Sequence, residues 1–465
     1  MRIRFLLSTA IAAATVGCAS VPPNSGFDDI AARLSDTGMA TPTWPGVTMS
    51  EADAQARIQI LLAEPLTEET AIELALLNNR ALHAEYLGLK AAAGDYKDQA
   101  SLPNPFVSAL VLDVEDEPVT NLSYGIGIEL LDVFFLPRRM KAAGQTFEAA
   151  QADTTAAVLD FVAEIRVAYY DVVAATQIVD LMDQAADASG ASVDVAQALF
   201  DAGNIAQVEL DREKLLAAEI ALEAMQARAA RAATIERFNA KAGLEGDLAA
   251  SWTIRGRLKN PPREEEFEPF DISQNLYLAA SDARIDAAGA RLGVKTASSF
   301  VGDFELELER ERDEGEWENG VGVALEVPIF NWGNGARQAA GARLQAMIEQ
   351  RVADRIELQA DARRLTGNLQ AARAAALFQR TELLPLAGRV MQGTQLDYNA
   401  MQIGVFALLD AKRDQLAAGR EYVSALRDYW ALKARYEQMI AGGSIGDIDM
   451  SKAASSAAPG DRGGH

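Results

Sequence analysis

The sequence is poor in the side chains that catalysis and metal binding most often use. Its 465 residues include one cysteine, Cys18, and two histidines, His83 and the terminal His465. A lone cysteine leaves no intramolecular disulfide to stabilise the fold, and two distant histidines do not form a site by their spacing. The sequence has neither a glycine-rich phosphate loop nor a carboxylate pattern typical of a metal site. It therefore predicts a protein that is not an enzyme and holds no cofactor.

Basic residues and long apolar runs are also scarce. Lysine and arginine together number 43 against 67 aspartates and glutamates, which gives a formal net charge of -24. Nucleic acid is disfavoured as a partner because its phosphates require a basic face. After the N-terminal segment no run of about 18 apolar residues occurs, so no transmembrane helix is predicted and any membrane span has to be β.

The N-terminus has the pattern of a secreted lipoprotein. Arg2 and Arg4 precede an apolar run over 5–16 that is too short to cross a bilayer, and Gly17-Cys18 follows it. We expect residues 1–17 to be a lipoprotein signal peptide and Cys18 to become the lipidated N-terminus. The competing interpretation is a thiol that is buried by chance, and Thr15 stands where a larger aliphatic residue is more usual.

The two ends of the mature chain differ in composition from its centre. Residues 18–65 contain five prolines and are expected to form an extended arm that wraps the body without a core of its own. Residues 442–465 are small, polar and rich in glycine, which predicts a disordered tail.

The central part of the chain is duplicated. Residues 125–144 resemble 320–341, and residues 202–205 resemble 400–403, each at a separation of about 200 residues. We therefore predict two tandem repeats, 66–260 and 261–441. Strands are expected at about 106–130 and helices at about 138–243 in the first, with strands at about 300–330 and helices at about 336–440 in the second.

Each repeat is expected to hold very long helices. Apolar and small residues recur at spacings of three and four over 158–200, which predicts a heptad seam on a helix from about Arg138 to Phe200. At 1.5 Å per residue this helix would be on the order of 90 Å long, too long for a compact globule. Two further seams are Leu215, Ala218, Leu222, Met225, Ala229 and Ala232, then Leu408, Ala411, Gln415, Ala418, Tyr422, Ala425, Tyr429 and Leu432.

The strands alternate instead of following a helical period. Phe304, Leu306 and Leu308 alternate with acidic residues, so one face of the sheet suits lipid and the other suits water. Four strands cannot close a membrane barrel, because an open edge leaves backbone groups unpaired in hydrocarbon, so several chains would share one barrel. A soluble sheet packed on a helical body shows the same alternation. The secretory signal, the lipidation site and the long helices favour the shared barrel.

Several weak motifs occur in a fixed order and are partly duplicated: 66–75 with Asn78-Asn79, 102–105, the 327–333 turn and the closing segment 398–430. Through their order and duplication the chain resembles the TolC family of outer-membrane efflux proteins over roughly residues 66–440. It implies a mainly α fold with a small β part, in which long antiparallel coiled-coil helices and four transmembrane β-strands per protomer form two tandem structural repeats. It also implies a homotrimer with one 12-stranded β-barrel, continued by an α-helical barrel across the periplasm.

The resemblance further implies a passive conduit in a tripartite efflux system. An inner-membrane pump, of the resistance-nodulation-division type, would deliver small molecules or metal ions through a periplasmic adaptor (membrane fusion) protein to a lipid-anchored channel in the outer membrane. The alternative is a periplasmic coiled-coil tether that conducts nothing and does not need the strand alternation. The segments 410–416 and 425–430 vaguely resemble family members that export copper and other heavy metals, and the exported substrate stays open between metals and drugs.

The resemblance places a candidate gate at the periplasmic tips of the helices. Asp410 aligns with an entrance aspartate that three-fold symmetry would repeat as a ring, although an ordinary solvated aspartate has the same signature. Tyr398 matches a latch tyrosine and Glu209 the acidic residue that it contacts. Ile403 replaces a second latch residue, an arginine, and Met401 replaces the tip glycine of the second repeat.

The barrel interior is expected to be acidic. This wall would favour cations over anions, but weakly, because a wide lumen is screened by salt. Its predicted members are Asp113, Glu129, Asp303, Glu305, Glu307, Glu309 and Glu326.

Overall fold

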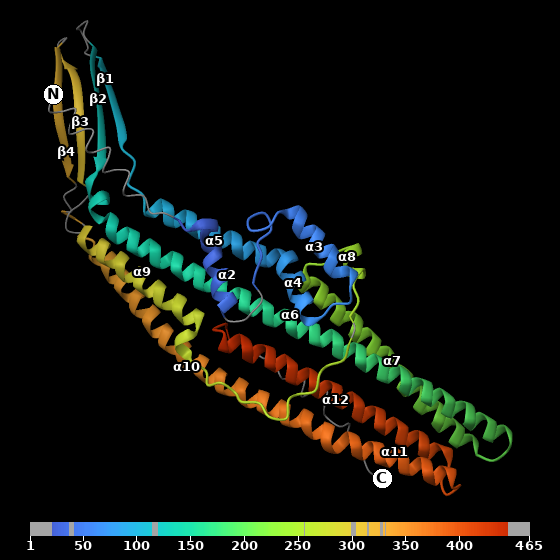
Figure 1. Cartoon of the computed structure of the whole chain (residues 1–465). Helices are drawn as coiled ribbons and strands as arrows, with labels where there is room; N and C mark the ends of the chain where they lie inside the picture. The colour runs from blue at the N-terminus through green and yellow to red at the C-terminus, as the bar shows by residue number, and fades with distance from the viewer. Residues whose placement is uncertain are drawn as a thin grey trace.

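The protein is a long rod of helices with a small sheet at one end (Figure 1). This computed structural model describes residues 21–36, 41–113, 120–254, 256–298, 304–313, 316–325, 329–330 and 332–444. The first half contains η1 (Pro23–Gly26), α2 (Phe27–Asp36), α3 (Glu51–Ala63), α4 (Glu68–Asn78), α5 (Arg80–Gln99), β1 (Phe106–Asp113), β2 (Thr120–Glu129), α6 (Leu130–Asp201) and α7 (Gln207–Ala242). The second contains α8 (Asp247–Ala250), η2 (Ile272–Gln274), α9 (Leu276–Ser298), β3 (Phe304–Asp313), β4 (Glu316–Leu325), α10 (Asn334–Phe378), the π-helical η3 (Gln379–Leu383), α11 (Leu384–Asn399) and α12 (Val405–Ile440).

The predicted fold class, mainly helical with a small sheet, is confirmed. The four strands form one antiparallel sheet in the order β1-β2-β3-β4, so β1 and β4 each leave one edge unpaired within the protomer. Long helices extend from one end of the sheet, lie side by side and finish in tips at the far end of the molecule (Figure 1). No helix in the described part of the chain is both long and apolar enough to cross a membrane.

Helix α6 is the spine of the molecule. Its 72 residues correspond to a rod of about 110 Å. The predicted seam is correct for this helix, since Val158, Ile165 and Val172 are all buried. The helix begins at Leu130 rather than near Arg138, so Pro137 lies inside it. An ion pair between Asp132 and Arg139 spans this proline and helps to hold the first turns in place.

The N-terminal arm was expected to be extended, and its described part corrects that prediction. Residues 27–36 and 51–63 form α2 and α3, whose apolar faces join the main core, α2 against α6 and α3 against α4. Phe27, Trp44 and Tyr86 stack as a cluster, with ring centroids 4.9 to 5.5 Å apart. The prolines of the arm lie at the start of η1 or between its helices, where they set the turns instead of preventing helix formation.

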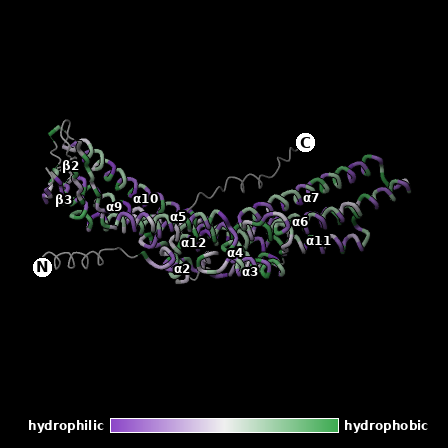
Figure 2. The backbone as a smooth tube through the Cα atoms, turned by 90° about the horizontal axis from the view of Figure 1, so that it is seen from above, coloured by the Kyte–Doolittle hydropathy of each residue, from purple (hydrophilic) through white to green (hydrophobic). Residues whose placement is uncertain are grey.

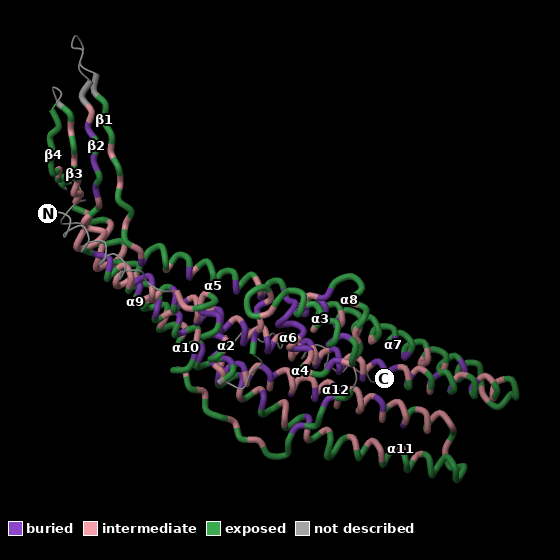
Figure 3. The backbone as a smooth tube through the Cα atoms, turned by 45° about the horizontal axis from the view of Figure 1, so that its top comes forward, coloured by how far each residue is buried: buried purple, intermediate pink, exposed green. Residues whose placement is uncertain are grey.

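The seam predicted for the second long helix is not the face that packs inside the protomer. On α7, Leu215, Leu222 and Met225 are each more than half exposed. The buried stripe is shifted around the helix to Ile220 and Ala224, which pack with α6 and α12. Helix α7 therefore carries two apolar stripes, and one of them is exposed in the described part of the chain. Figure 2 shows hydrophobic and hydrophilic residues alternating along the long helices, and Figure 3 shows that burial concentrates in the middle of the body and thins toward the tips.

The two repeats close their helices with the same local devices. Asn79 and Asn275 cap α5 and α9, each accepting a backbone N–H three residues on. Each repeat ends in a left-handed glycine, Gly243 or Gly442, at which a Cβ would lie 2.5 Å from a backbone oxygen. The duplication seen in the sequence is thus repeated in the capping contacts.

The tip turns also match each other, although one contains an unfavourable residue. After α6, Gly203 has a φ of 74°, and after α11 Met401 has a φ of 58°. The backbone hydrogen bonds agree as well: the N–H of Gly203 donates to the carbonyl of Phe200 and that of Met401 to the carbonyl of Tyr398. The left-handed conformation suits glycine and is strained for methionine. The Met401 side chain is 93% exposed, so packing does not explain its presence.

Replacing Met401 with glycine is therefore expected to stabilise the second tip turn by about 1 kcal/mol, because the strain of the left-handed conformation is removed. The converse change, Gly203→Ala, should destabilise the first turn by a similar amount. Hydrogen exchange of the backbone amides over 396–408 in the full-length protein measures the local opening. Exchange rates that stay the same in M401G would contradict the strain at this position.

Candidate functional site

The sheet gathers its described carboxylates on one face. Glu305, Glu307 and Glu309 alternate along β3 with the apolar residues. Glu129 of β2 lies opposite Glu305, and Glu311 lies opposite Glu318 of β4. Because directly opposed residues in an antiparallel pair share a face, these acidic side chains form one surface across three strands.

The opposite face of the sheet is apolar and exposed. Ile126 of β2, Leu308 of β3 and Val321 of β4 lie in one cross-strand row, and each is more than half exposed. Val107 continues the row on β1. A continuous exposed apolar face of this kind marks a surface that contacts lipid or another protein.

Two glycines in β2 leave room for side chains of the neighbouring strands on the acidic face. The hydroxyl of Ser108 on β1 donates a hydrogen bond to the carboxylate of Glu307 on β3, directly over Gly125. A Cβ at Gly125 would lie 2.3 Å from Glu307 Oε1, and one at Gly127 would lie 2.3 Å from the ring of Phe106. The glycines of the Gly-Ile-Gly-Ile stretch therefore leave the space in which the Glu307 side chain lies on the acidic face.

Most of the described members of the predicted acidic wall come together. Glu129, Glu305, Glu307 and Glu309 share the acidic face. Asp303 and Glu326 lie outside the described residues. Asp113 pairs with Thr120, and its position in β1 has the same parity as Val107 and Val111 of the apolar face. The strand register therefore does not support its place in the acidic wall. Its side chain is outside the described part.

The prediction missed the outer half of the same surface. Glu311, Glu316 and Glu318 also belong to the acidic face. They were overlooked because Arg310 and Arg312 interrupt the apolar side of the alternation. The strict alternation of charge over 309–313 was the signal that could have found them.

The three predicted gate residues stand near the helical tips but do not contact one another. Glu209 accepts the backbone N–H of Ala206 at 3.3 Å, so it caps the start of α7. Asp410 pairs with Arg413 one turn further along α12, at 3.4 Å. Within the described protomer no hydrogen bond links Tyr398 with Glu209. A Tyr398–Glu209 latch therefore stays a prediction about an arrangement beyond this single chain.

Asp410 borders a small cleft where three helices meet. The cleft is lined by Ser189 and Ser192 of α6, by Glu213 of α7 and by Asp410 and Arg413 of α12. The Ser192 hydroxyl donates to Glu213 at 2.6 Å. The cleft lies between the α6–α7 hairpin and α12, so Asp410 stands at the seam between the two hairpins.

One tie between these hairpins was not predicted. Arg420 of α12 contacts Glu223 of α7 at 3.0 Å. Next to it, Leu416 packs between Met182 and Ile220. Both charged residues are partly exposed, so the ion pair is weak on its own and readily reversible. The sequence offers no local signal for a pair that lies 197 positions apart.

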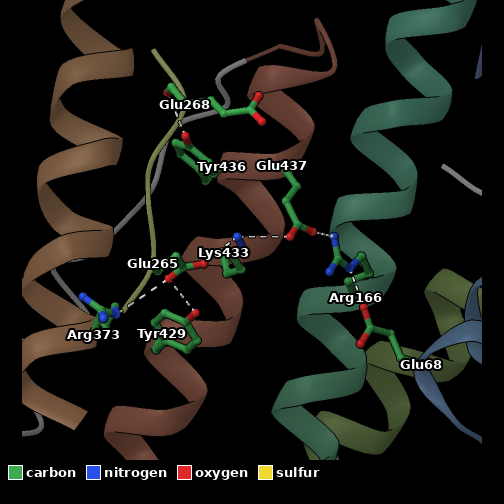
Figure 4. A network of polar contacts seen from close by, with 9 residues as sticks. All are labelled: Glu68, Arg166, Glu265, Glu268, Arg373, Tyr429, Lys433, Tyr436 and Glu437. Carbon is green, nitrogen blue, oxygen red and sulfur yellow. Dashed lines mark hydrogen bonds and ion pairs between the residues drawn. The ribbon is translucent and has the colours of Figure 1, made fainter. Parts of the chain in front are cut away.

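The middle of the body is held far more firmly (Figure 4). Arg166 of α6, whose side chain is 12% exposed, binds Glu68 at the start of α4 at 2.6 Å and also binds Glu437 of α12. Lys433 links Glu437 with Glu265, which precedes η2. Burial opposes the charge of Arg166, but the two carboxylates outweigh it, and the pKa of Arg166 is raised above its ordinary value. The network joins elements of both repeats at the waist of the rod.

Comparison with known proteins agrees with this architecture. Residues 71–243 match the family model described as outer membrane efflux protein. The cobalt-zinc-cadmium resistance protein CzcC of Cupriavidus metallidurans is 26% identical over 368 residues, covering 78% of this chain and 87% of the relative.

Solved channel structures share the fold. The outer membrane protein VceC of Vibrio cholerae aligns with a TM-score of 0.67 at 18% identity, over 84% of this chain and 97% of that one. The Campylobacter jejuni outer membrane channel CmeC aligns with a TM-score of 0.66 at 14% identity, over 90% and 94% of the two chains.

The fold, the two-faced sheet and these matches point to one class of protein: the chain is similar to outer membrane efflux proteins, and it shares its fold with solved outer-membrane channels. Its function is that of an outer-membrane efflux channel. Proteins of this family work with periplasmic adaptors and inner-membrane pumps.

Reversing the charge at the hairpin tie, by Arg420→Glu, is expected to raise the open probability of the channel in planar bilayers. An exposed ion pair contributes at most about 1 kcal/mol, which corresponds to a change of roughly fivefold in the equilibrium between the closed and open states. Combining Arg420→Glu with Glu223→Arg restores the attraction and should restore the wild-type value. A double variant that behaves like the sum of its two single variants would show that the pair does not hold the hairpins together.

Proposed function

We propose that this protein forms, as a homotrimer, the exit duct through which a tripartite exporter releases divalent metal cations across the outer membrane. The acidic face of the sheet carries the proposal. In a closed barrel this face would line the lumen, and symmetry would triple Glu129, Glu305, Glu307 and Glu309. Such a lumen favours cations, while the apolar face of the same strands fits hydrocarbon.

Two features support a trimer. The unpaired edges of β1 and β4 need partners in a membrane, and a neighbouring copy can offer β4 to β1. Helix α7 exposes the apolar stripe Val208, Leu215, Leu222 and Met225, and α11 exposes Leu386, Val390 and Leu396. These stripes lie on different hairpins, so they suit a head-to-tail ring in which α7 of one copy packs beside α11 of the next.

The tips fit a role in docking the periplasmic adaptor. Both tip turns are exposed, and Met401 offers an apolar side chain in the second turn. An inner-membrane pump of the resistance-nodulation-division type would deliver cargo through that adaptor. Cys18 and the signal segment lie outside the described residues, and lipidation of Cys18 in the outer membrane is part of this proposal.

Metal cargo is favoured over drugs by the relative CzcC, whose name refers to cobalt, zinc and cadmium resistance, together with the acidic face. Among the described residues no group of histidine, cysteine, aspartate and glutamate side chains forms a candidate metal site. Cations would therefore be attracted by a field of carboxylates and pass through. The alternative of a non-conducting tether is disfavoured because a tether has no use for a sheet with sorted faces.

The proposed conduction path predicts cation selectivity that depends on named carboxylates. Asp410→Asn, and separately Glu305→Gln with Glu307→Gln and Glu309→Gln, should lower the cation-to-anion permeability ratio toward one, more strongly at low salt because screening is weaker there. The reversal potential across a planar bilayer under a KCl gradient measures this. A triple Gln variant at Glu51, Glu64 and Glu85, exposed carboxylates of the body, is the matched control. Equal effects of control and wall variants would remove the wall from the path.

The proposed cargo predicts the phenotype of a deletion strain. Loss of the gene should sensitise cells to cobalt, zinc and cadmium more than to hydrophobic drugs or bile salts, as measured by minimal inhibitory concentrations. The wild-type gene should restore resistance, whereas a Cys18→Ser form should restore it less if the lipid anchor is needed. Sensitivity to drugs alone would assign the duct to drug export, and full growth under both stresses would favour the tether.

A further inference from the structure

The four strands contain only two basic residues, and both lie on the apolar face. Arg310 and Arg312 are the sole lysines or arginines within β1 to β4. In β3 they lie on the same face as Leu306 and Leu308, while the neighbouring glutamates lie on the opposite face. Period-two alternation therefore directs both positive charges away from the acidic face.

The two arginines belong to an aromatic cluster at the end of the sheet that is distant from the helices. Arg310 lies opposite Tyr124 and Asn319, and Arg312 lies opposite Trp317. The Arg310 guanidinium is 4.9 Å from the centroid of the Trp317 ring, and that of Arg312 is 6.0 Å from it. The rings of Tyr124 and Trp317 are 5.5 Å apart. These contacts hold the guanidinium groups over an aromatic surface.

Neither guanidinium has an anionic partner among the described residues. Both side chains are exposed, and no carboxylate of the described part comes within ion-pair distance of them. The nearest row of the same face, toward the helices, is Ile126, Leu308 and Val321, which is apolar. An unpaired arginine is costly in hydrocarbon and tolerated at the level of lipid headgroups, where an anion is available.

We propose that Arg310 and Arg312, held by Trp317 and Tyr124, bind the phosphate group of a lipid in the outer leaflet. This inference rests on the proposed function, which puts the apolar face in the outer membrane with the strand ends outward. Guanidinium groups bind phosphate oxygens in a bidentate manner, and two of them on successive positions of one face match a headgroup with more than one phosphate. An aromatic belt alone accounts for Trp317 and Tyr124 but not for two arginines.

The test uses the full-length protein in detergent and native mass spectrometry with three lipids: a diphosphorylated glucosamine lipid, the same lipid without phosphate, and phosphatidylglycerol. The wild type should bind the diphosphorylated lipid at least about tenfold more tightly than its dephosphorylated form. Arg310→Gln with Arg312→Gln should abolish this preference. Arg343→Gln with Arg355→Gln, which removes the same charge from exposed positions of α10, should retain it.

Each other outcome overturns a separate part of the argument. Equal affinity for both glucosamine lipids, or a preference that survives in the Arg310 and Arg312 variant, would refute the phosphate site while leaving the channel intact. Stronger binding of phosphatidylglycerol than of the diphosphorylated lipid would refute the outer-leaflet source. A protein that stays monodisperse without detergent and retains none of the three lipids would instead refute the membrane placement and the proposed function with it.

Discussion

The structure depends on covering the length of α6. A helix of 72 residues is far from stable as an isolated rod in water, because most helical stability in proteins comes from packing of an apolar face. Different partners cover successive stretches: α9 and α5 near the sheet, the arm and α4 at the waist, and α7 and α12 toward the tips. The second repeat is therefore required by the first, since α9 and α12 bury surfaces of α6 that its own repeat leaves bare.

This cover is uneven, and the unevenness has a functional meaning. At the waist, large apolar side chains pack together and the little-exposed Arg166 pairs with the carboxylates of Glu68 and Glu437, and breaking such contacts is costly. At the tips the hairpins meet through few buried residues and through ion pairs that water reaches. Local opening occurs most easily where buried apolar contacts are few. This gradient suits the proposed duct, whose gate is proposed to lie at the helical tips.

Much of this architecture could be predicted from the sequence because it follows from short-range periods. Spacings of three and four located the seam of α6, and alternation located the two faces of β3 and β4. The same reasoning found only one of the two stripes on α7, because Leu215 and Leu222 are as periodic as Ile220 and Ala224, and the period does not say which stripe meets the same chain. The contacts at the tips were out of reach for a related reason: Tyr398 and Glu209 do not meet within one protomer, and the Arg420–Glu223 ion pair joins helices from different repeats.

Strand β3 joins fold and function in a single constraint. Its sequence from Glu305 to Arg312 sends the glutamates to one face and both arginines, with Leu306 and Leu308, to the other. Because the side-chain period of a strand is two, a register slip of one residue would turn the glutamates toward the apolar face. Carboxylates on an apolar surface are unfavourable, so charge reinforces the register that the apolar residues already favour. The property that would make the inner surface attractive to cations is thus the same property that fixes how the strands pair.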